Sequence, residues 1–215
     1  MLLVRKTAQL AVYDEAVTPD QFAALGSWVS KSVYRTPSSA EGWVKIWRLG
    51  DGEPMATGPS YLSKGPFNSP LDAVAALAIE AARLNPDIIK PYRDIVFSTY
   101  LYTRGIKLSW HFDGDVFSGA FNFYVHPYWA STWGGEFMFA ETPPADPSRT
   151  AYGAHPDFGH GWEDQQLAAI GIGSWLLPKP NRMVIIAPGT FHSVNRVDAD
   201  AGDNVRCAIT AFYQR

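Results

Sequence analysis

Asp94-Ile95-Val96-Phe97-Ser98-Thr99-Tyr100-Leu101-Tyr102-Thr103 is the stretch that decides the fold class, because β-branched and aromatic residues fill it. Such residues favour extended strands, and we expect one at Ile95–Thr103. Comparable runs, separated by Gly and Pro, follow at Ala120–Val125, Glu136–Ala140, Arg182–Ile186 and Val205–Tyr213. Many short strands within one domain predict a mainly β fold, either a sandwich or a jelly roll.

Two helices are expected before these strands. Thr18-Pro19-Asp20-Gln21 combines a capping residue, a Pro at the first helical position and a Gln at the third, so it predicts a helix from Pro19 to about Ser30. The same start signal at Ser69-Pro70-Leu71-Asp72 predicts a second helix that runs to about Leu84 and ends at Asn85-Pro86. We expect both N-terminal helices to pack on one outer face of the β core. The apolar positions of the first helix share one face: Phe22, Leu25, Trp28 and Val29.

Three further segments have weaker signals. Trp43–Trp47 is interpreted as a strand and Gly50-Asp51-Gly52 as a turn. Glu141–Pro180 has little strand character, although a short helix is predicted at about Glu163–Ile170. Long insertions of this kind often form lids or binding loops.

The length of 215 residues and the hydrophobic content of 47% fit one domain with a sizeable core. We therefore expect a single domain over residues 1–215. Residues 1–93 would form a helical support region, and residues 94–215 a jelly-roll core that carries an insertion at about 141–180. Aromatic residues make up 14% of the chain, which also suits an apolar pocket with polar anchors.

Charge and cysteine content exclude several classes of function. The net charge is −3 and no basic run occurs, which disfavours nucleic-acid binding. No apolar stretch is long enough to span a membrane, and Met1–Lys6 becomes charged before a signal-peptide core could form. Cys207 is the only cysteine, so an intrachain disulfide and a thiolate metal cluster are excluded. A cytoplasmic enzyme is expected, and the sequence leaves its oligomeric state open.

Trp110-His111-Phe112-Asp113 is the first motif that indicates chemistry. Residues two apart on a strand point to the same side, so the His111 imidazole and the Asp113 carboxylate can face one point. His192 follows an apolar strand and a turn and is the best third ligand. Two histidines and one carboxylate occupy one face of an octahedral iron(II) and leave the other positions open. Either motif alone is more often structural than catalytic.

Other motifs lie around these three residues in a definite order. Tyr102 and Gly105 precede the His-x-Asp pair, and Tyr124-Val125-His126 follows it. Gly134-Gly135-Glu136-Phe137-Met138-Phe139, Pro180-Asn181-Arg182 and Arg206-Cys207-Ala208-Ile209-Thr210 come next. In this order, the segment from about Tyr100 to Tyr213 resembles the prolyl-hydroxylase branch of the iron(II)/2-oxoglutarate oxygenases. The resemblance implies a double-stranded β-helix, the jelly roll of that family.

The resemblance also implies the roles of individual residues. His111, Asp113 and His192 would hold iron(II), and 2-oxoglutarate would chelate the same ion. The far carboxylate of 2-oxoglutarate needs a buried cation, which Arg206 can supply as a bidentate fork. The Thr210 hydroxyl could donate to the same ligand, Tyr124 would hydrogen-bond its far carboxylate, and Tyr102 would also line this pocket.

Some positions keep an alternative interpretation. Arg206 on an isolated strand would rather form a surface ion pair with Asp203 or Asp198. The gap between His192 and Arg206 is longer than usual for the family, and we expect Val197–Asn204 to loop out. His126 stands where the family has Asn and is assigned a structural or pocket role.

The remaining candidates have weaker support. His155 and His160, with Asp157 nearby, could form a second metal site or contact substrate, but loop histidines are usually solvated. Asp115 could compete with Asp113 as a ligand. Cys207 is more consistent with the core than with a nucleophile. Three tryptophans are candidates to wall a substrate site, or they pack in the core: Trp133, Trp162 and Trp175.

By this resemblance the chain uses O2 to hydroxylate an unactivated C–H bond of a small molecule or a peptidyl side chain, and releases succinate and CO2. A small molecule is favoured, because an insertion can close over a small ligand. Asp113 disfavours halogenation, whereas desaturation, epimerisation and ring formation remain open. One alternative is a metal-binding jelly-roll protein that oxidises nothing, in which Arg206→Ala would leave ligand binding intact. Another is a cupin-like dioxygenase without cosubstrate, which usually has more histidine ligands.

Overall fold

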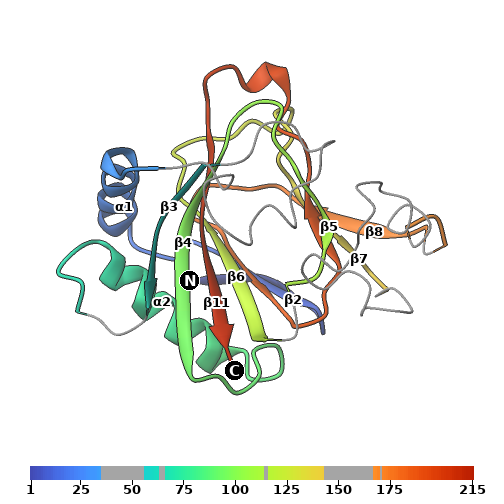
Figure 1. Cartoon of the computed structure of the whole chain (residues 1–215), viewed down its shortest axis with the longest axis horizontal. Helices are drawn as coiled ribbons and strands as arrows, with labels where there is room; N and C mark the ends of the chain where they lie inside the picture. The colour runs from blue at the N-terminus through green and yellow to red at the C-terminus, as the bar shows by residue number, and fades with distance from the viewer. Residues whose placement is uncertain (35–55, 63–65, 114–115, 143–166, 170) are drawn as a thin grey trace.

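Two antiparallel β-sheets form the centre of the molecule (Figure 1). The computed structural model describes residues 1–34, 56–62, 66–113, 116–142, 167–169 and 171–215. Within these residues, the larger sheet has seven strands in the order β1-β2-β9-β6-β11-β4-β3, and the smaller has four in the order β5-β10-β7-β8. This mainly β, jelly-roll architecture with flanking helices is the predicted fold class.

The strands of the larger sheet are β1 (Leu2–Lys6), β2 (Leu10–Asp14), β9 (Met183–Ile186), β6 (Phe117–Tyr124), β11 (Arg206–Gln214), β4 (Asp94–Tyr102) and β3 (Ala56–Leu62). Those of the smaller sheet are β5 (Leu108–His111), β10 (His192–Val194), β7 (Phe137–Ala140) and β8 (Gly173–Leu176). The five strands expected after residue 93 are confirmed as β4, β6, β7, β9 and β11, each within three residues of the predicted bounds.

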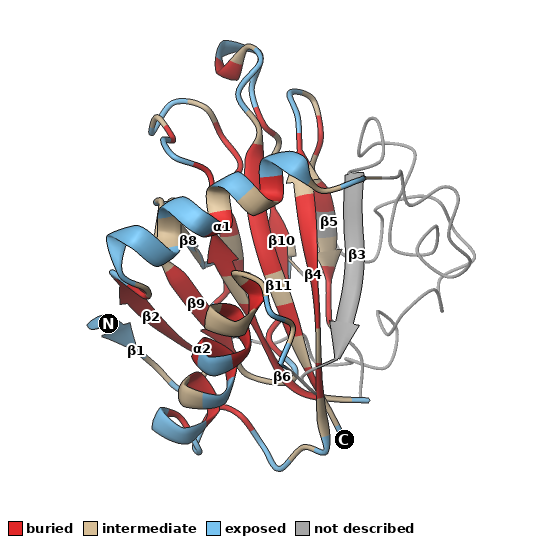
Figure 2. Ribbon diagram, turned by 90° about the vertical axis from the view of Figure 1, so that its left-hand side faces the viewer, coloured by how far each residue is buried: buried red, intermediate tan, exposed pale blue. Residues whose placement is uncertain are grey.

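Two helices cover the outer face of the larger sheet (Figure 2). Helix α1 (Pro19–Lys31) begins with the predicted capping box, in which the Thr18 hydroxyl accepts from the Gln21 N–H and the Gln21 side chain accepts from the Thr18 N–H. Helix α2 (Leu71–Leu84) starts just after Pro70, and the Ser69 hydroxyl accepts from the Leu71 N–H. Buried residues of both helices pack in one cluster with β2, β6 and β11, as expected for helices on one outer face.

Several strands were missed or lie where little strand was expected. Strands β1 and β2 were not predicted, because residues 1–93 were expected to form a helical support region. Strand β3 contains Gly58 and Pro59, which argue against a strand, and its pairing with β4 shifts register between Thr57 and Ser60. It lies at the edge of the sheet, where a Pro is tolerated. Strand β8 corrects the expectation that residues 141–180 lack strands.

Some predicted elements fall outside the described residues. They include the strand at Trp43–Trp47 and the turn at Gly50-Asp51-Gly52. Of the helix predicted at Glu163–Ile170, Leu167–Ala169 are described and helical. None of the helices in the described ranges has the length and apolar character that crossing a membrane requires.

Successive side chains of β11 point alternately to the two faces of the larger sheet. Cys207, Ile209, Ala211 and Tyr213 point to the helices and belong to the helix-covered core. Ala208 and Phe212 instead pack with Phe137 and Phe139 of the smaller sheet. The inner face of β11, which also carries Arg206 and Thr210, therefore looks into the space between the sheets.

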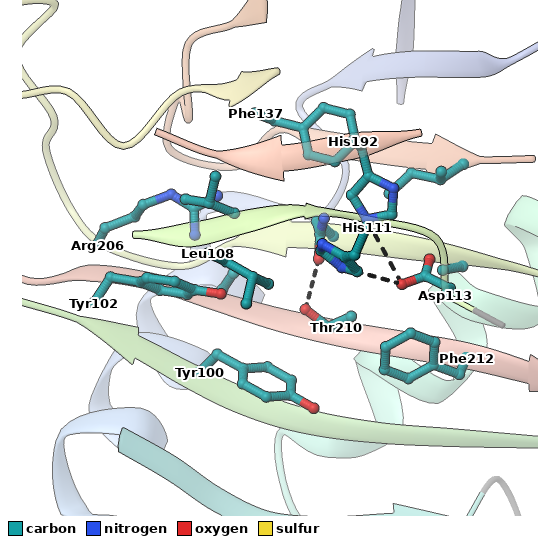
Figure 3. A pocket seen from close by; sticks show the side chains of 15 residues that line it. Tyr100, Tyr102, Leu108, His111, Asp113, Phe137, His192, Arg206, Thr210 and Phe212 are labelled. Atoms are coloured by element: carbon teal, nitrogen blue, oxygen red, sulfur yellow. Dashed lines mark hydrogen bonds and ion pairs between the residues drawn. The ribbon is translucent and has the colours of Figure 1, made fainter. Parts of the chain in front are cut away.

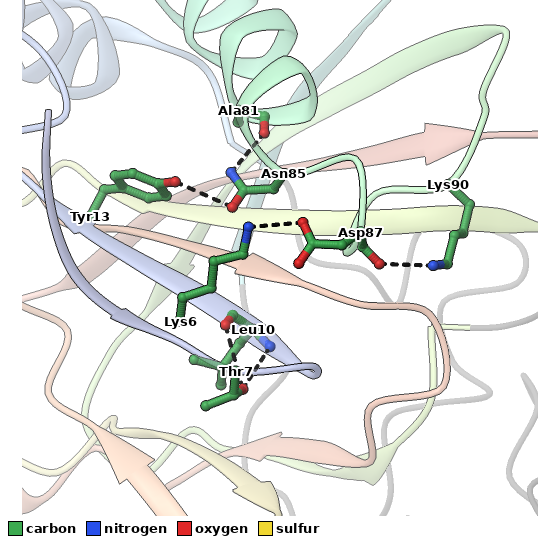
Figure 4. A network of polar contacts seen from close by, with 8 residues as sticks. All are labelled: Lys6, Thr7, Leu10, Tyr13, Ala81, Asn85, Asp87 and Lys90. Atoms are coloured by element: carbon green, nitrogen blue, oxygen red, sulfur yellow. Dashed lines mark hydrogen bonds and ion pairs between the residues drawn. The ribbon is translucent and has the colours of Figure 1, made fainter.

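Buried polar contacts tie the N-terminal strands to the end of α2 (Figure 4). Asn85 is fully buried; its Oδ1 accepts from the Tyr13 hydroxyl at 3.2 Å, and its Nδ2 donates to the Ala81 carbonyl at 2.9 Å. Lys6 Nζ lies 2.8 Å from Asp87 Oδ1 on the surface nearby. Because a buried amide without partners is costly, these bonds fix where β2 lies relative to α2.

Candidate metal and anion pocket

Two histidines lie side by side on neighbouring strands of the smaller sheet. His111 is the last residue of β5 and His192 the first of β10, and the two residues are paired in the antiparallel ladder. Their ring centroids are 4.4 Å apart. His192 Nδ1 donates to the Thr190 carbonyl at 2.8 Å, which leaves the Nε2 lone pair for another partner.

Asp113 completes a group of three with these histidines (Figure 3). Its Oδ1 lies 3.7 Å from His111 Nε2 and 3.6 Å from His192 Nε2. The prediction that Asp113 lies on the same strand as His111 was wrong, because β5 ends at His111 and Asp113 follows it. The carboxylate reaches the common point from the residue after the strand's end.

The three donor atoms lie within 4.8 Å of one another, and this is the only such group of His, Cys, Asp or Glu among the described residues. Donors bound about 2.1 Å from one ion are themselves about 3 Å apart, so a small adjustment would let all three bind the same ion. Burial raises the pKa of the Asp113 carboxyl, and a positive charge on His192 opposes that effect. A bound cation would favour the ionised carboxylate.

Arg206 is buried deep in the same pocket. It is 1% exposed, its Nε donates to the Gly135 carbonyl at 2.7 Å, and its Nη2 has no hydrogen-bond partner among the described residues. The guanidinium carbon lies 4.8 Å from the Tyr102 ring centroid and 5.0 Å from that of Tyr124. The alternative of a surface ion pair with Asp198 or Asp203 is therefore wrong for Arg206. A buried cation with an unused donor is suited to an anionic ligand.

The Gly134-Gly135 pair holds this arrangement together. Both residues have positive φ, +69° and +70°, which favours glycine. A Cβ on Gly134 would lie 2.0 Å from the Arg196 carbonyl oxygen, and a Cβ on Gly135 would lie 2.8 Å from Arg206 Cδ. The glycines thus let the chain before β7 approach Arg206 closely enough to accept its hydrogen bond.

The other predicted pocket residues lie near Arg206. Tyr102 is buried and lines the pocket, whereas Tyr124 is fully buried and is not among the lining residues, although its ring lies close to the Arg206 guanidinium. The Tyr124 hydroxyl has no partner by hydrogen-bond geometry among the described residues. Burial raises the pKa of Tyr124, and the positive charge of Arg206 opposes this rise. The Thr210 hydroxyl donates to Asn122 Oδ1 at 2.6 Å, so it is already engaged.

Residues from both sheets line the pocket. Several lining residues had no role assigned from the sequence: Tyr100, Leu108, Ala120, Asn122, Phe137, Ile186, Val194, Ala208 and Phe212. Asn122 could have been found, because it lies two residues before Tyr124 and is the polar residue in an aromatic run.

His126 has a structural role. Its Nδ1 accepts from the Cys207 N–H at 3.1 Å, and its Nε2 donates to the Pro178 carbonyl at 2.6 Å. Burial lowers the pKa of His126 to about 4, and the nearby positive charge of Arg206 acts in the same direction. A neutral ring thus joins the end of β6 to β11 and to the segment before β9.

Of the predicted substrate residues that the structure describes, neither Trp133 nor Trp175 lines the pocket. Trp133 packs edge-on against Trp129 and Tyr128, and it does not line the pocket. Trp175 is 63% exposed and pairs with Met138, whereas Phe137, which lines the pocket, points to the other face of the sheet. We therefore do not retain Trp175 as a substrate contact. Four other candidates lie outside the described residues: Asp115, His155, His160 and Trp162.

No protein-family model and no curated protein matches this sequence. Solved structures nevertheless resemble the chain over nearly its whole length. A prolyl-4-hydroxylase from Pseudomonas putida superposes with a TM-score of 0.65 at 14% identity, over 96% of this chain and 93% of that one. A prolyl hydroxylase from Trichoplax adhaerens, in complex with a hypoxia inducible factor peptide fragment, gives 0.61 at 12% identity, over 97% and 84%.

A third similar structure has a different activity. The non-heme alpha-ketoglutarate-dependent epimerase SnoN from nogalamycin biosynthesis gives a TM-score of 0.60 at 14% identity, over 96% of this chain and 76% of that one. At such identities the similarity concerns the backbone arrangement and not the reaction. The chain therefore has the fold of the iron(II)/2-oxoglutarate oxygenases, and prolyl hydroxylases are among its structural neighbours.

Proposed function

We propose that this chain is an iron(II)- and 2-oxoglutarate-dependent dioxygenase. One observation carries the proposal: a His-His-Asp group and a buried arginine with an unused donor line the same pocket. A metal-binding protein without cosubstrate would have no need for a buried, incompletely paired guanidinium, which costs stability.

The residues present fit iron(II). His111, Asp113 and His192 offer two imidazole nitrogens and a carboxylate oxygen from one side of the pocket. This set suits non-heme iron(II) and leaves coordination positions for the cosubstrate and oxygen. Because Asp113 takes the carboxylate position, halogenation is disfavoured. The Thr190 carbonyl would hold His192 in the tautomer that ligates through Nε2.

The residues present also fit 2-oxoglutarate. Arg206 Nη2 and the Tyr124 hydroxyl are both buried without partners among the described residues, and both can donate to a carboxylate. The Arg206 guanidinium lies between the rings of Tyr102 and Tyr124, so its direction is restricted before ligand binds. Ala208, opposite Tyr124 on the neighbouring strand, leaves room above the sheet for the ligand.

When bound, iron(II) and 2-oxoglutarate would activate O2 for attack on a substrate C–H bond, with one oxygen atom entering succinate as CO2 is released and the other entering the substrate. The protein's own part is to orient the anion, to ligate the metal from one side and to keep water away. Leu108, Phe137 and Val194 cover the pocket from the smaller sheet with apolar surface, which strengthens the charge pairing of Arg206.

We propose hydroxylation of a small molecule or a peptidyl side chain as the reaction. Prolyl hydroxylases are among the neighbours, and one of them was solved with a peptide. Epimerisation is the second candidate, because SnoN has a similar fold and one of its structures contains Fe³⁺, alpha-ketoglutarate and nogalamycin RO. Desaturation and ring formation use the same cofactors and are further outcomes for product analysis.

Anaerobic titration of the iron(II)-loaded protein with 2-oxoglutarate tests the proposal. The wild type should develop the weak visible charge-transfer band of the chelate. His111→Ala should abolish the band through loss of a ligand. Arg206→Met should retain iron but require at least about 100-fold more 2-oxoglutarate, because the far carboxylate loses a charged partner.

Iron content of each variant, measured by a colorimetric chelator assay, is the control. A wild-type protein that binds iron but shows no band and no 2-oxoglutarate binding would refute the dioxygenase and favour a non-oxidative metal-binding protein. Unchanged 2-oxoglutarate affinity in Arg206→Met would refute the anchor role of Arg206.

A further inference from the structure

The inner face of the larger sheet changes polarity in steps along β11. Arg206 is paired with Tyr102 of β4. Two residues further along β11, Ala208 lies between Tyr100 of β4 and Tyr124 of β6. The guanidinium carbon of Arg206 is close to both Tyr102 and Tyr124, so the cationic end of the pocket lies over these first two rows of residues.

The next row across the sheet is polar. Thr210 is paired with Ser98 of β4 and with Asn122 of β6. Beyond it, Phe212 is paired with Ala120, and the floor becomes apolar. Successive rows are about 6–7 Å apart along a strand, so the polar row lies one such step from Ala208, on the side away from Arg206.

The candidate metal triad lies in the same direction, from Arg206 toward Thr210. Leu108 and Val194 of the smaller sheet pack in one cluster with Tyr100 and Tyr102, near the cationic end. His111 and His192 are paired further along the same two strands. Figure 3 shows Thr210 between Arg206 and Asp113 in that view. The polar row is therefore the part of the floor nearer to the triad, and it lies next to whatever part of a ligand approaches the metal.

Asn122 presents an unused donor there. Its Oδ1 accepts from the Thr210 hydroxyl at 2.6 Å, which fixes the amide. Its side chain lines the pocket, and its Nδ2 makes no hydrogen bond to the described part of the chain. A half-buried amide that is held through its oxygen and belongs to a pocket-lining residue has two N–H groups left for a ligand acceptor.

We propose that Asn122 is a specificity-determining contact for the metal-binding end of the cosubstrate, and that Thr210 is a positioning residue that acts through it. This proposal rests on the proposed function. It revises the role predicted for Thr210: the hydroxyl orients the Asn122 amide, and the Asn122 Nδ2 is the group that donates to the 2-oxo acid end. Arg206 would then recognise one end of the ligand and Asn122 the other.

If Asn122 donates a hydrogen bond to the ligand, two substitutions of nearly equal size should weaken ligand binding to different degrees. Asn122→Leu removes the donor without adding charge. Asn122→Asp keeps the shape and can still accept from Thr210, but it replaces the donor with a negative charge that repels an anion. If Asn122 served only for packing, Asn122→Asp would be the milder change. As a ligand contact, it must be the more harmful one.

The experiment is calorimetric titration of 2-oxoglutarate into anaerobic iron(II)-loaded protein. We expect Asn122→Leu to weaken binding about 10- to 100-fold, the effect of one hydrogen bond to a charged group. Asn122→Asp should weaken it more. Thr210→Val should weaken it by less than Asn122→Leu does, whereas Thr210→Ser, which keeps the hydroxyl, should restore wild-type affinity.

Thr99→Val is the matched control, because Thr99 is buried on β4 opposite Ile209, on the helix-covered face of the same sheet. It should bind 2-oxoglutarate as the wild type does. Wild-type affinity in Asn122→Leu, or a loss in Asn122→Asp no larger than in Asn122→Leu, would overturn the inference while the dioxygenase assignment stands. Absence of 2-oxoglutarate binding by the wild type would instead refute the proposed function itself.

Discussion

Gly135 connects an unusual backbone conformation with the position of Arg206, the proposed anchor for 2-oxoglutarate. Its φ of +70° favours glycine, and its carbonyl accepts the Arg206 Nε–H bond. In Gly135→Ala the new Cβ would lie 2.8 Å from Arg206 Cδ, so the arginine must move. We expect 2-oxoglutarate affinity to fall about tenfold or more and the free energy of unfolding to fall by about 1–3 kcal/mol.

Gly202→Ala separates the two effects of that substitution. Gly202 also has a positive φ, +57°, but a Cβ there would have no neighbour within 4 Å. This variant should lose about 1–2 kcal/mol of stability from backbone strain alone and keep its affinity for 2-oxoglutarate. Chemical denaturation and calorimetric titration of both variants provide the comparison. Equal losses of affinity in the two variants would contradict the steric argument about Arg206.

At this scale the sequence predicted the candidate metal ligands and the buried cation better than the residues around them. His111, Asp113, His192 and Arg206 could be singled out because residues of their types in that order indicate specific chemistry. Asn122 could be noticed beside Tyr124, but its hydrogen bond to Thr210 could not be predicted, because Thr210 lies on a neighbouring strand. A strand register cannot be read from one strand alone, since it is fixed by pairing partners distant in sequence.

At the scale of elements, His126 joins three segments. It accepts from Cys207 of β11 and donates to Pro178, and it lies two residues after the end of β6. Its pKa falls from 6.5 to about 4 because burial penalises the charged ring. As the pH decreases below 6.5, the unfolded chain therefore binds a proton that the folded protein does not. Stability contributed by neutral His126 is complete above pH 6.5 and is lost as the pH falls toward 4.

Urea unfolding at pH 6.5 and pH 5 tests whether neutral His126 stabilises the fold. Between these values the wild type should lose about 1.5 kcal/mol more stability than His126→Asn, which has no proton to gain. At pH 6.5 the variant should be the less stable protein, because the shorter amide cannot keep both hydrogen bonds. The same pH slope for both proteins would show that His126 does not titrate in this range.

Elements were predictable where propensity and burial agreed. Strands β4, β6 and β11 are long and rich in aromatic or β-branched residues, and the capping box of α1 is a local signal. Strand β10 has only three residues, and β8 begins with Gly173. Such strands exist because partners hold them: β10 lies between β5 and β7, and β8 pairs with β7. Tertiary pairing, and not local preference, determines them.

At the scale of the whole molecule, metal and cosubstrate should join the two sheets, because their proposed ligands come from both. Saturation with iron(II) and 2-oxoglutarate at about 100 times the dissociation constant should stabilise the fold by about 2.7 kcal/mol. For a chain of this size the melting temperature should rise by roughly 5–10 °C. Differential scanning fluorimetry under anaerobic conditions measures the shift.

Arg206→Met provides the contrast for this experiment. Without ligand it should be at least as stable as the wild type, because it replaces a buried, incompletely paired charge with an apolar side chain. With iron(II) present, 2-oxoglutarate at the same concentration should add at most about 0.4 kcal/mol, because an affinity at least about 100-fold weaker leaves the site no more than half saturated. A strongly destabilised ligand-free variant would show that Arg206 supports the fold itself.

The order of strands in the larger sheet also governs how the chain can be made. Residues 10–13 of β2 pair with residues 183–186 of β9, and β6 lies between β9 and β11. A growing polypeptide that has emerged only as far as residue 180 therefore has three strands of the larger sheet, β2, β4 and β6, that each lack a neighbour still to be synthesised. Pairings so distant along the chain are associated with folding in milliseconds to seconds. During translation, the exposed edges of β2, β4 and β6 are the sites at which chaperones or misassembly would act first.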